Sequence, residues 1–147
     1  MTKSKVEEAV AYFEQGFCCS QAVFATYAGP LGLKPEIALP IADAFGAGMG
    51  GMAETCGAVT GAFMVIGLKY GRVHAGDSAA KEKTRRLVKE FVRQFKNRHG
   101  SITCKTLLDV DISTDEGKKA ADEKGLFKTL CPQFVRDAAE ILENVMD

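Results

Sequence analysis

Apolar side chains recur every three or four positions along most of the chain, which is the spacing of an amphipathic helix. In the N-terminal third this spacing predicts helices over residues 4–15, 20–28 and 35–45. Gly16 and the Gly29-Pro30 pair stop the first two, because glycine and proline interrupt helices. Pro35 suits the first turn of the third helix, where its missing N–H is not needed.

A glycine-rich stretch, Gly46 to Gly51, separates these helices from the next one. Glycine makes regular structure costly, so the stretch predicts a tight loop. The segment that follows, through Tyr70, is apolar or small on nearly every face. A helix of that kind is buried on most of its sides, so we expect it to lie at the centre of the fold.

Helical spacing continues to the C-terminus, with Asp77 as the expected N-cap of the longest helix. The predicted elements are residues 78–98, short segments around 103–109 and 115–124, and a final helix over 132–145. No stretch alternates as a strand would, and there is no internal repeat or low-complexity linker. The sequence therefore predicts an all-α, single-domain bundle of about five to seven helices around a buried central helix, spanning residues 1–147.

Composition narrows the classes of partner. The 19 basic residues balance the 19 acidic ones, which gives no reason to expect a nucleic acid partner. The eight basic residues between Lys81 and Arg98 are typical of a solvated helix face. The longest apolar stretch, Ala58 to Leu68, is far shorter than the ~20 residues that cross a bilayer, and the polar N-terminus lacks a secretory signal. We therefore expect a cytoplasmic protein without membrane insertion.

Five cysteines are many for a cytoplasmic chain of 147 residues. Structural disulfides are rare in that compartment, where cysteines more often bind metal or do redox chemistry. Four of the five lie within a residue or two of a predicted helix start: Cys19, Cys56, Cys104 and Cys131. A helix N-terminus carries about half a positive charge, which stabilises a thiolate and lowers the pKa of a cysteine. These four are the candidate catalytic residues, with Cys56 the leading candidate for the reactive thiolate.

The surroundings of the cysteines refine this hypothesis. Pro132 makes Cys131 the expected N-cap of the last helix. Cys18 adjoins Cys19, and a disulfide between neighbours is strained, so Cys18 is expected to be a packing residue or a spare thiol. The gaps between the four cysteines are too long for C-x-x-C zinc knuckles or for a thioredoxin-type motif.

Three other patterns carry less information. The glycines at 46, 48 and 51 match the dinucleotide fingerprint, but a helix precedes them and no acidic residue follows ~20 positions later, so a Rossmann site is rejected. The acidic residues from Asp109 to Asp115 lack the glycine and glutamate of a calcium loop. His74 and His99 are expected at the surface. The alternative for His99 is that it reaches Cys104 as a base or ligand.

Several motifs of the chain occur together: C-G-A-V-T-G at Cys56 to Gly61, the glycine-rich stretch before it, Cys19-Ser-Gln-Ala-Val, Cys104 and Cys131-Pro132. In this combination the chain resembles the C_GCAxxG_C_C family of redox-active proteins. The resemblance covers essentially the whole length. It implies that Cys19, Cys56, Cys104 and Cys131 are the family's four cysteines and that Cys18 is an addition. It also implies redox activity and a functional link to transporters, since genes of the family often neighbour transporter genes.

Three functions fit these observations. The first is a thiol–disulfide oxidoreductase or electron-transfer protein in which Cys56 attacks and another cysteine resolves, with a redox protein or small thiol as partner. The second is a metal module in which Cys19, Cys56, Cys104 and Cys131 bind zinc or an iron–sulfur cluster. The third is a helical interaction protein whose cysteines only pack and whose small-residue face at Gly57 and Gly61 forms a homodimer contact.

Overall fold

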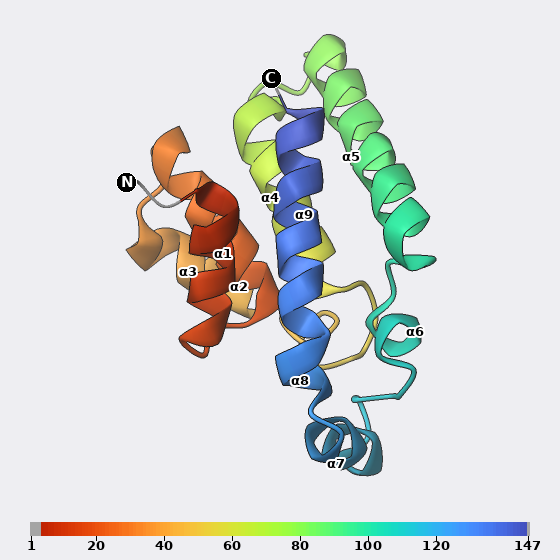
Figure 1. The fold of residues 1–147 in the computed structure, drawn as a ribbon. Helices are drawn as coiled ribbons and strands as arrows, with labels where there is room; N and C mark the ends of the chain where they lie inside the picture. Colours follow the sequence, from red (N-terminus) through yellow and green to blue (C-terminus); the bar gives the residue numbers. More distant parts are fainter. Residues whose placement is uncertain (1–3, 147) are drawn as a thin grey trace.

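Nine α-helices and one 3-10 turn make up residues 4–146, which the computed structural model describes (Figure 1). In chain order they are α1 (Lys5–Glu14), α2 (Cys19–Ala28), the turn η1 (Gly29–Leu31), α3 (Pro35–Asp43), α4 (Gly57–Tyr70), α5 (Ser78–His99), α6 (Cys104–Leu108), α7 (Asp115–Glu123), α8 (Leu126–Thr129) and α9 (Cys131–Val145). Within those residues the extended pairing is limited to one isolated antiparallel bridge, between Thr55 and Thr103. The predicted all-α fold is confirmed.

The helix boundaries differ from the sequence prediction mainly around α8 and α9. Helix α8 has four residues, too few to show a periodic pattern, and it follows the left-handed Gly125 (φ +68°). Cys131 is the first residue of α9 rather than its N-cap, and Leu130 before it also has helical dihedrals (φ −96°, ψ −46°). The expected extended conformation before Pro132 is therefore wrong. Instead α8 runs almost directly into α9.

Two helices, α2 and α4, form the centre of the molecule. Helix α2 packs against α1, α3, α4 and α9, while α4 packs against α2, α5 and α9. Nine of the ten residues of α2 and eight of the 14 residues of α4 are buried. Figure 1 shows α1 to α3 on one side of α4 and α9, with α5 on the other side. The predicted central helix is thus correct, and α2 is a second one that the pattern did not single out.

Glycines of α4 allow α2 to approach it closely. A Cβ atom on Gly61 would lie 2.8 Å from the backbone oxygen of Ser20 and 3.1 Å from the Cβ of Val23, and one on Gly57 would lie 3.0 Å from the backbone nitrogen of Ser20. The small-residue face is therefore covered by α2 of the same chain. The expected homodimer contact through Gly57 and Gly61 is wrong, because this face is already buried inside the fold.

We expect Gly61→Ala to lower the free energy of unfolding by about 1–3 kcal/mol, since the added methyl overpacks the α2–α4 contact. Gly67→Ala is the matched control in the same helix. Nothing lies within 4 Å of its added Cβ, so it should be neutral or raise stability by up to about 1 kcal/mol. Chemical denaturation of both variants checks this. Equal effects of the two changes would show that the close approach does not control stability.

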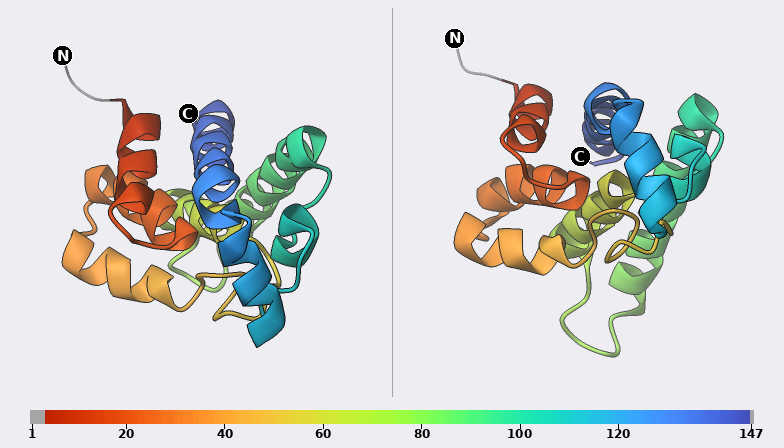
Figure 2. Two further views of the ribbon diagram at one scale, coloured as in Figure 1. Left: turned by 60° about the horizontal axis from the view of Figure 1, so that its bottom comes forward. Right: turned by 90° about the horizontal axis from the view of Figure 1, so that it is seen from below.

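Polar contacts tie α9 to its neighbours and so fix where its first residue lies. The Tyr27 hydroxyl of α2 donates to a Glu143 carboxylate oxygen at 2.6 Å. On the other side, the buried Asp137 carboxylate bonds Arg98 of α5 (Nη1, 3.1 Å) and His99 (Nε2, 2.7 Å). Seen from the end at which α9 begins, in Figure 2, α8 and the glycine-rich loop gather beside that end. This is where the cysteines meet.

Candidate functional site

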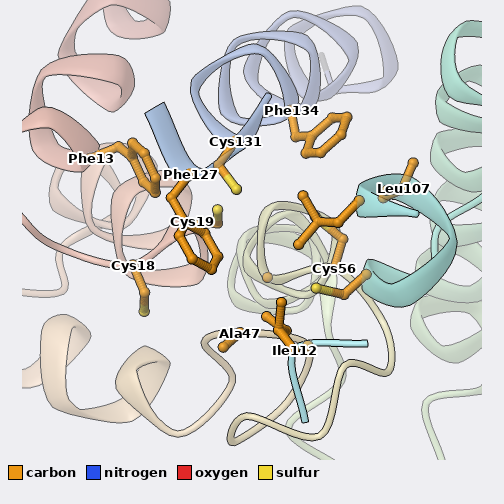
Figure 3. A pocket seen from close by; sticks show the side chains of 14 residues that line it. Phe13, Cys18, Cys19, Ala47, Cys56, Leu107, Ile112, Phe127, Cys131 and Phe134 are labelled. Carbon is orange, nitrogen blue, oxygen red and sulfur yellow. The ribbon is translucent and has the colours of Figure 1, made fainter. Parts of the chain in front are cut away.

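Cys19 and Cys131 are brought together by the starts of α2 and α9. Cys19 is the first residue of α2, and Cys131 is the first residue of α9. Figure 3 shows their two sulfur atoms pointing toward one another. The two thiols are close enough for a side-chain hydrogen bond between them to affect both of their pKa values. Two cysteines more than a hundred residues apart in the chain therefore form a side-chain pair.

Cys56 and Cys104 are positioned by the isolated bridge between Thr55 and Thr103. The Cys56 N–H donates to the Ile102 oxygen (2.7 Å), and the Cys104 N–H donates to the Glu54 oxygen (2.6 Å). Each cysteine follows a bridge residue, so both lie on the opposite face of the bridge from the two threonines. Cys56 then caps α4 and Cys104 opens α6. All four cysteines thus lie at helix starts, as predicted.

The glycine-rich loop closes the site from below in Figure 3, where Ala47 faces it. Ala47 (φ +54°) and Gly48 (φ +70°) both have left-handed dihedrals, and a Cβ on Gly48 would lie 2.5 Å from the Cα of Ala53. Gly46 makes room for Cys18, since a Cβ atom added to Gly46 would lie 2.6 Å from the Cys18 sulfur. Left-handed backbone in a non-glycine residue is costly and persists only where the surroundings hold it. The surrounding contacts therefore hold the loop in this conformation beside the thiols.

A single cavity of about 120 Å³ collects the cysteines. All five line it, together with Ala47, Gly48 and Gly57 of the loop and α4. The rest of the wall consists of large apolar side chains from five segments: Phe13, Leu107, Leu108, Ile112, Phe127 and Phe134. No charged side chain of the described residues lines it. Cys56, Cys104 and Cys131 are exposed to only 4%, 8% and 8%, while Cys18 and Cys19 are half-buried.

The Cys19–Cys131 pair has asymmetric electrostatics. The hydrogen bond from Cys19 lowers the pKa of Cys131 below its ordinary value, against the opposing effect of burial. The same bond, followed by burial and by the neighbouring thiols, raises the pKa of Cys19 well above its ordinary value. A hydrogen bond donated to a thiolate favours the charged form. Of the two, Cys131 is therefore the more readily ionised thiol and Cys19 the one that holds its proton more strongly.

The expectation that Cys56 has a low pKa differs from the structure. Burial raises the pKa of Cys56 to about 12, although the N–H groups of Ala58 and Val59 at the start of α4 oppose the change. Burial likewise raises the pKa of Cys104 to about 11, with further contributions from Cys131 and Asp111. Desolvation disfavours a charge more strongly here than the helix terminus favours it. The local environment thus favours ionisation of Cys131 over that of Cys56.

Several lining residues were not identified from the sequence. Phe13 and Phe127 belong to α1 and α8, and only the packing of those two helices brings them to the same wall. Cys18 is more than a spare thiol, because it is the N-cap residue of α2 and lines the cavity. Its N–H donates to Gln21 Oε1 at 3.1 Å. The sequence signal for this role was the glutamine three residues after the cap, as in a capping box.

His99 does not line the thiol cavity. It is half-buried, not at the surface as expected, with its ring 5.0 Å from the Phe134 ring and its Nε2 bonded to Asp137. Phe134 in turn lines the cavity. His99 therefore supports the wall from outside, and its Nε2 is engaged by Asp137 rather than by Cys104. His74 is exposed, as predicted.

Two structural tests bear on metals and membranes. Among residues 4–146, no group of three or more cysteine, histidine or acidic side chains is arranged to hold a metal ion. The four cysteines share a cavity without closing around a common centre. In the same part of the chain, no helix is long and apolar enough to cross a membrane.

Comparison with known families identifies the family of this chain. A family model described as "Putative redox-active protein (C_GCAxxG_C_C)" matches residues 17–145. The chain belongs to this family. The C_GCAxxG_C_C match contains every cysteine and extends to the last residue of α9. A search of curated proteins finds no match, and neither does a search of solved structures.

Proposed function

We propose that this protein is a thiol–disulfide oxidoreductase in which Cys131 is the attacking thiolate and Cys19 resolves the mixed disulfide. The observation that carries the proposal is that the Cys19 and Cys131 sulfur atoms point toward one another inside a shared apolar cavity. An effective two-cysteine site needs one thiolate that attacks and a second thiol within reach of the resulting bond. Membership of a redox-active family agrees with this chemistry.

The proposed reaction has two exchange steps. In the first, the Cys131 thiolate attacks a substrate disulfide, forms a mixed disulfide and expels one substrate thiolate. In the second, Cys19 loses its proton, attacks the Cys131 sulfur and expels the other substrate thiolate. The substrate disulfide gains two electrons and becomes two thiols, while the protein dithiol becomes a Cys19–Cys131 disulfide. An external thiol returns the protein to the reduced form by the reverse exchange.

Cys56 and Cys104 take no part in the first attack. With pKa values of about 12 and 11, they are thiols at neutral pH. A thiol is a far weaker nucleophile than a thiolate. Their raised pKa values therefore fit a structural role in the wall of the site. Cys131 remains the thiol that makes the first attack.

We expect Cys19→Ser to trap the mixed disulfide on Cys131, because the resolving thiol is missing while a hydroxyl still donates to the sulfur. Cys131→Ser should form no mixed disulfide at this pair. Both variants are mixed with a small disulfide at pH 7, quenched with acid and analysed by peptide mass spectrometry. Cys18→Ser, which changes another cysteine of the cavity, is the matched control and should complete the Cys19–Cys131 disulfide. Trapping on Cys19 instead of Cys131 would reverse the assignment.

A metal or iron–sulfur module is the second candidate, favoured by the convergence of all four family cysteines on one cavity. Thiolates are the ligands of zinc and of iron–sulfur clusters, so the donor set is suitable. Binding would require Cys19, Cys56 and Cys104 to lose protons that their raised pKa values retain, and the four sulfurs to move around one centre. Anaerobic purification with metal and sulfide analysis tests it. Stoichiometric metal, lost in Cys56→Ser and Cys104→Ser, would favour this candidate over exchange.

The third candidate, in which the cysteines only pack, predicts a different pattern of thiol alkylation. All of them would then react with alkylating reagents only after denaturation. Reaction of Cys131 in the folded protein would exclude this third candidate.

A further inference from the structure

Two aromatic side chains lie between the thiol cavity and a hollow on the outer surface. Phe13 and Phe127 line the cavity, and the same two side chains line a hollow on the outer surface together with Glu14, Lys128 and Pro132. Both rings are half-buried, as expected of a wall with one face toward solvent and one toward the cavity. Figure 3 shows Phe13 and Phe127 beside the Cys19–Cys131 pair. The two rings therefore form a shared wall between the outer hollow and the thiols.

Charge changes sharply across this wall. On the outer side the hollow carries the exposed Glu14 and Lys128. On the inner side no charged side chain of the described residues lines the cavity, and its polar groups are thiols. A charge that entered would lose its water without gaining a partner, which is strongly unfavourable. The cavity therefore accepts uncharged groups.

The size of the cavity sets a second limit. Its volume of about 120 Å³ is somewhat less than that of an apolar cavity of about 150 Å³ that holds one benzene molecule. The disulfide of glutathione carries four carboxylates and two tripeptide arms, so neither its charge nor its bulk suits the space. A protein disulfide is larger still. A compound with a few non-hydrogen atoms around its sulfurs fits.

We propose that Phe13 and Phe127 form an aperture that restricts the substrates of this site to small, uncharged disulfides and related sulfur electrophiles. The proposal rests on the proposed exchange at Cys131 and names the substrate class of that site. Phe127 is the specificity-determining residue chosen for the test. It lies on the four-residue helix α8. The charged rim at Glu14 and Lys128 lies outside the aperture and does not contact the reacting sulfurs.

Thiosulfonates test the class, because charge can be varied while the reacting group stays the same. The Cys131 thiolate attacks the sulfenyl sulfur of S-methyl methanethiosulfonate, the methyl disulfide forms on Cys131, and methanesulfinate leaves with the electron pair. The sulfonatoethyl and trimethylammonioethyl reagents react in the same way and carry one negative or one positive charge. Each rate is measured by mass spectrometry as the loss of the free Cys131 thiol, which counts both the mixed disulfide and the Cys19–Cys131 disulfide formed from it. It is then divided by the rate of free cysteine with that reagent.

In the unmodified protein we expect the normalised rate of the uncharged reagent to exceed both charged ones by at least about a hundredfold, since a charge must be desolvated to enter. Phe127→Ala should reduce this ratio to within about tenfold by opening the wall to water. Phe127→Trp should slow the uncharged reagent by at least about tenfold by narrowing the aperture. Phe127→Leu replaces the alanine variant if thermal melting shows that the alanine variant is unfolded.

Leu126→Ala is the matched control. Leu126 precedes Phe127 on α8 and is half-buried like it, but does not line the cavity, so the ratio should not change. Equal normalised rates for the three reagents in the unmodified protein would overturn the substrate class while leaving exchange at Cys131 intact. A ratio unchanged in folded Phe127 variants would overturn the aperture. A folded protein in which Cys131 reacts with no reagent would overturn the proposed exchange itself.

Discussion

Replacing Cys131 with serine is expected to lower the rate at which the folded protein reacts with iodoacetamide at pH 7 by at least about a hundredfold. The reason is the scarcity of other thiolates in the cavity. A thiol with a pKa of about 11, such as Cys104, is ionised in about one molecule in ten thousand at pH 7. Cys56, with a pKa of about 12, is ionised less still. The experiment uses a Cys18→Ser background, so that the half-buried neighbour of Cys19 does not contribute.

The pH dependence of this reaction identifies what stabilises the thiolate. In the parent protein the rate should reach half of its maximum below the ordinary cysteine pKa, since the hydrogen bond from Cys19 lowers the pKa of Cys131. Cys19→Ala removes the donor and leaves burial, which raises the pKa of Cys131. The profile should then move to higher pH, with a loss of about tenfold at pH 7 for each unit by which the pKa rises.

Cys19→Ser provides the matched control for this shift, because its hydroxyl can still donate to the sulfur. Its profile should lie between those of the parent and Cys19→Ala. Rates are taken from stopped reactions analysed on the Cys131 peptide across pH 5 to 10. Identical profiles for the parent and Cys19→Ala would show that the pair does not control the ionisation of Cys131.

The positions of the cysteines could be predicted from sequence because helix ends are encoded locally. Glycine, proline and capping residues near each thiol indicate where a helix begins, and the structure places Cys19, Cys56 and Cys104 within one residue of those starts. At Cys131 the same local reasoning was off by one residue, because Leu130, between α8 and α9, already has helical dihedrals.

The sign of the pKa changes could not be predicted from helix position alone. A helix terminus acts within its own first turn, so its effect on Cys56 is visible in the sequence as the N–H groups that follow it. Desolvation depends on how completely α2, α6 and α9 cover that residue, and this is set by contacts between distant segments. At Cys56 the second effect exceeds the first. At Cys131 a hydrogen bond from Cys19, 112 positions earlier in the chain, reverses the balance.

The aperture was out of reach of sequence analysis for the same reason. Phe13 has the spacing of an ordinary core residue on an amphipathic helix, and Phe127 lies in a helix too short to give a pattern. Nothing local links them. Their common position beside the thiols arises only when α1 and the α8–α9 unit pack together.

Burial of Cys56 should also make the fold sensitive to alkali. The folded-state pKa of about 12 lies well above the ordinary value of 9.0, so between these values the unfolded chain loses a proton that the folded protein keeps. The contribution of Cys56 to stability is complete below pH 9 and is lost as the pH rises toward 12. The loss amounts to about 2 kcal/mol at pH 10.5 and on the order of 4 kcal/mol at pH 12. Cys104 changes stability in the same direction.

Urea unfolding from pH 7 to 10.5, with a phosphine to keep the thiols reduced, measures this loss. The difference between the parent and Cys56→Ala reports the titration of Cys56 together with its repulsion of the neighbouring thiolates, while titration of Tyr27 affects both proteins alike. The variant should therefore lose about 2 kcal/mol less than the parent over this range. Val59→Ala, a buried change in the same helix that removes no titrating group, should lower stability by a similar amount at every pH. If Cys56→Ala keeps the full alkaline loss, the Cys56 thiol ionises as readily in the folded protein as in the unfolded chain, and its burial does not hold its proton.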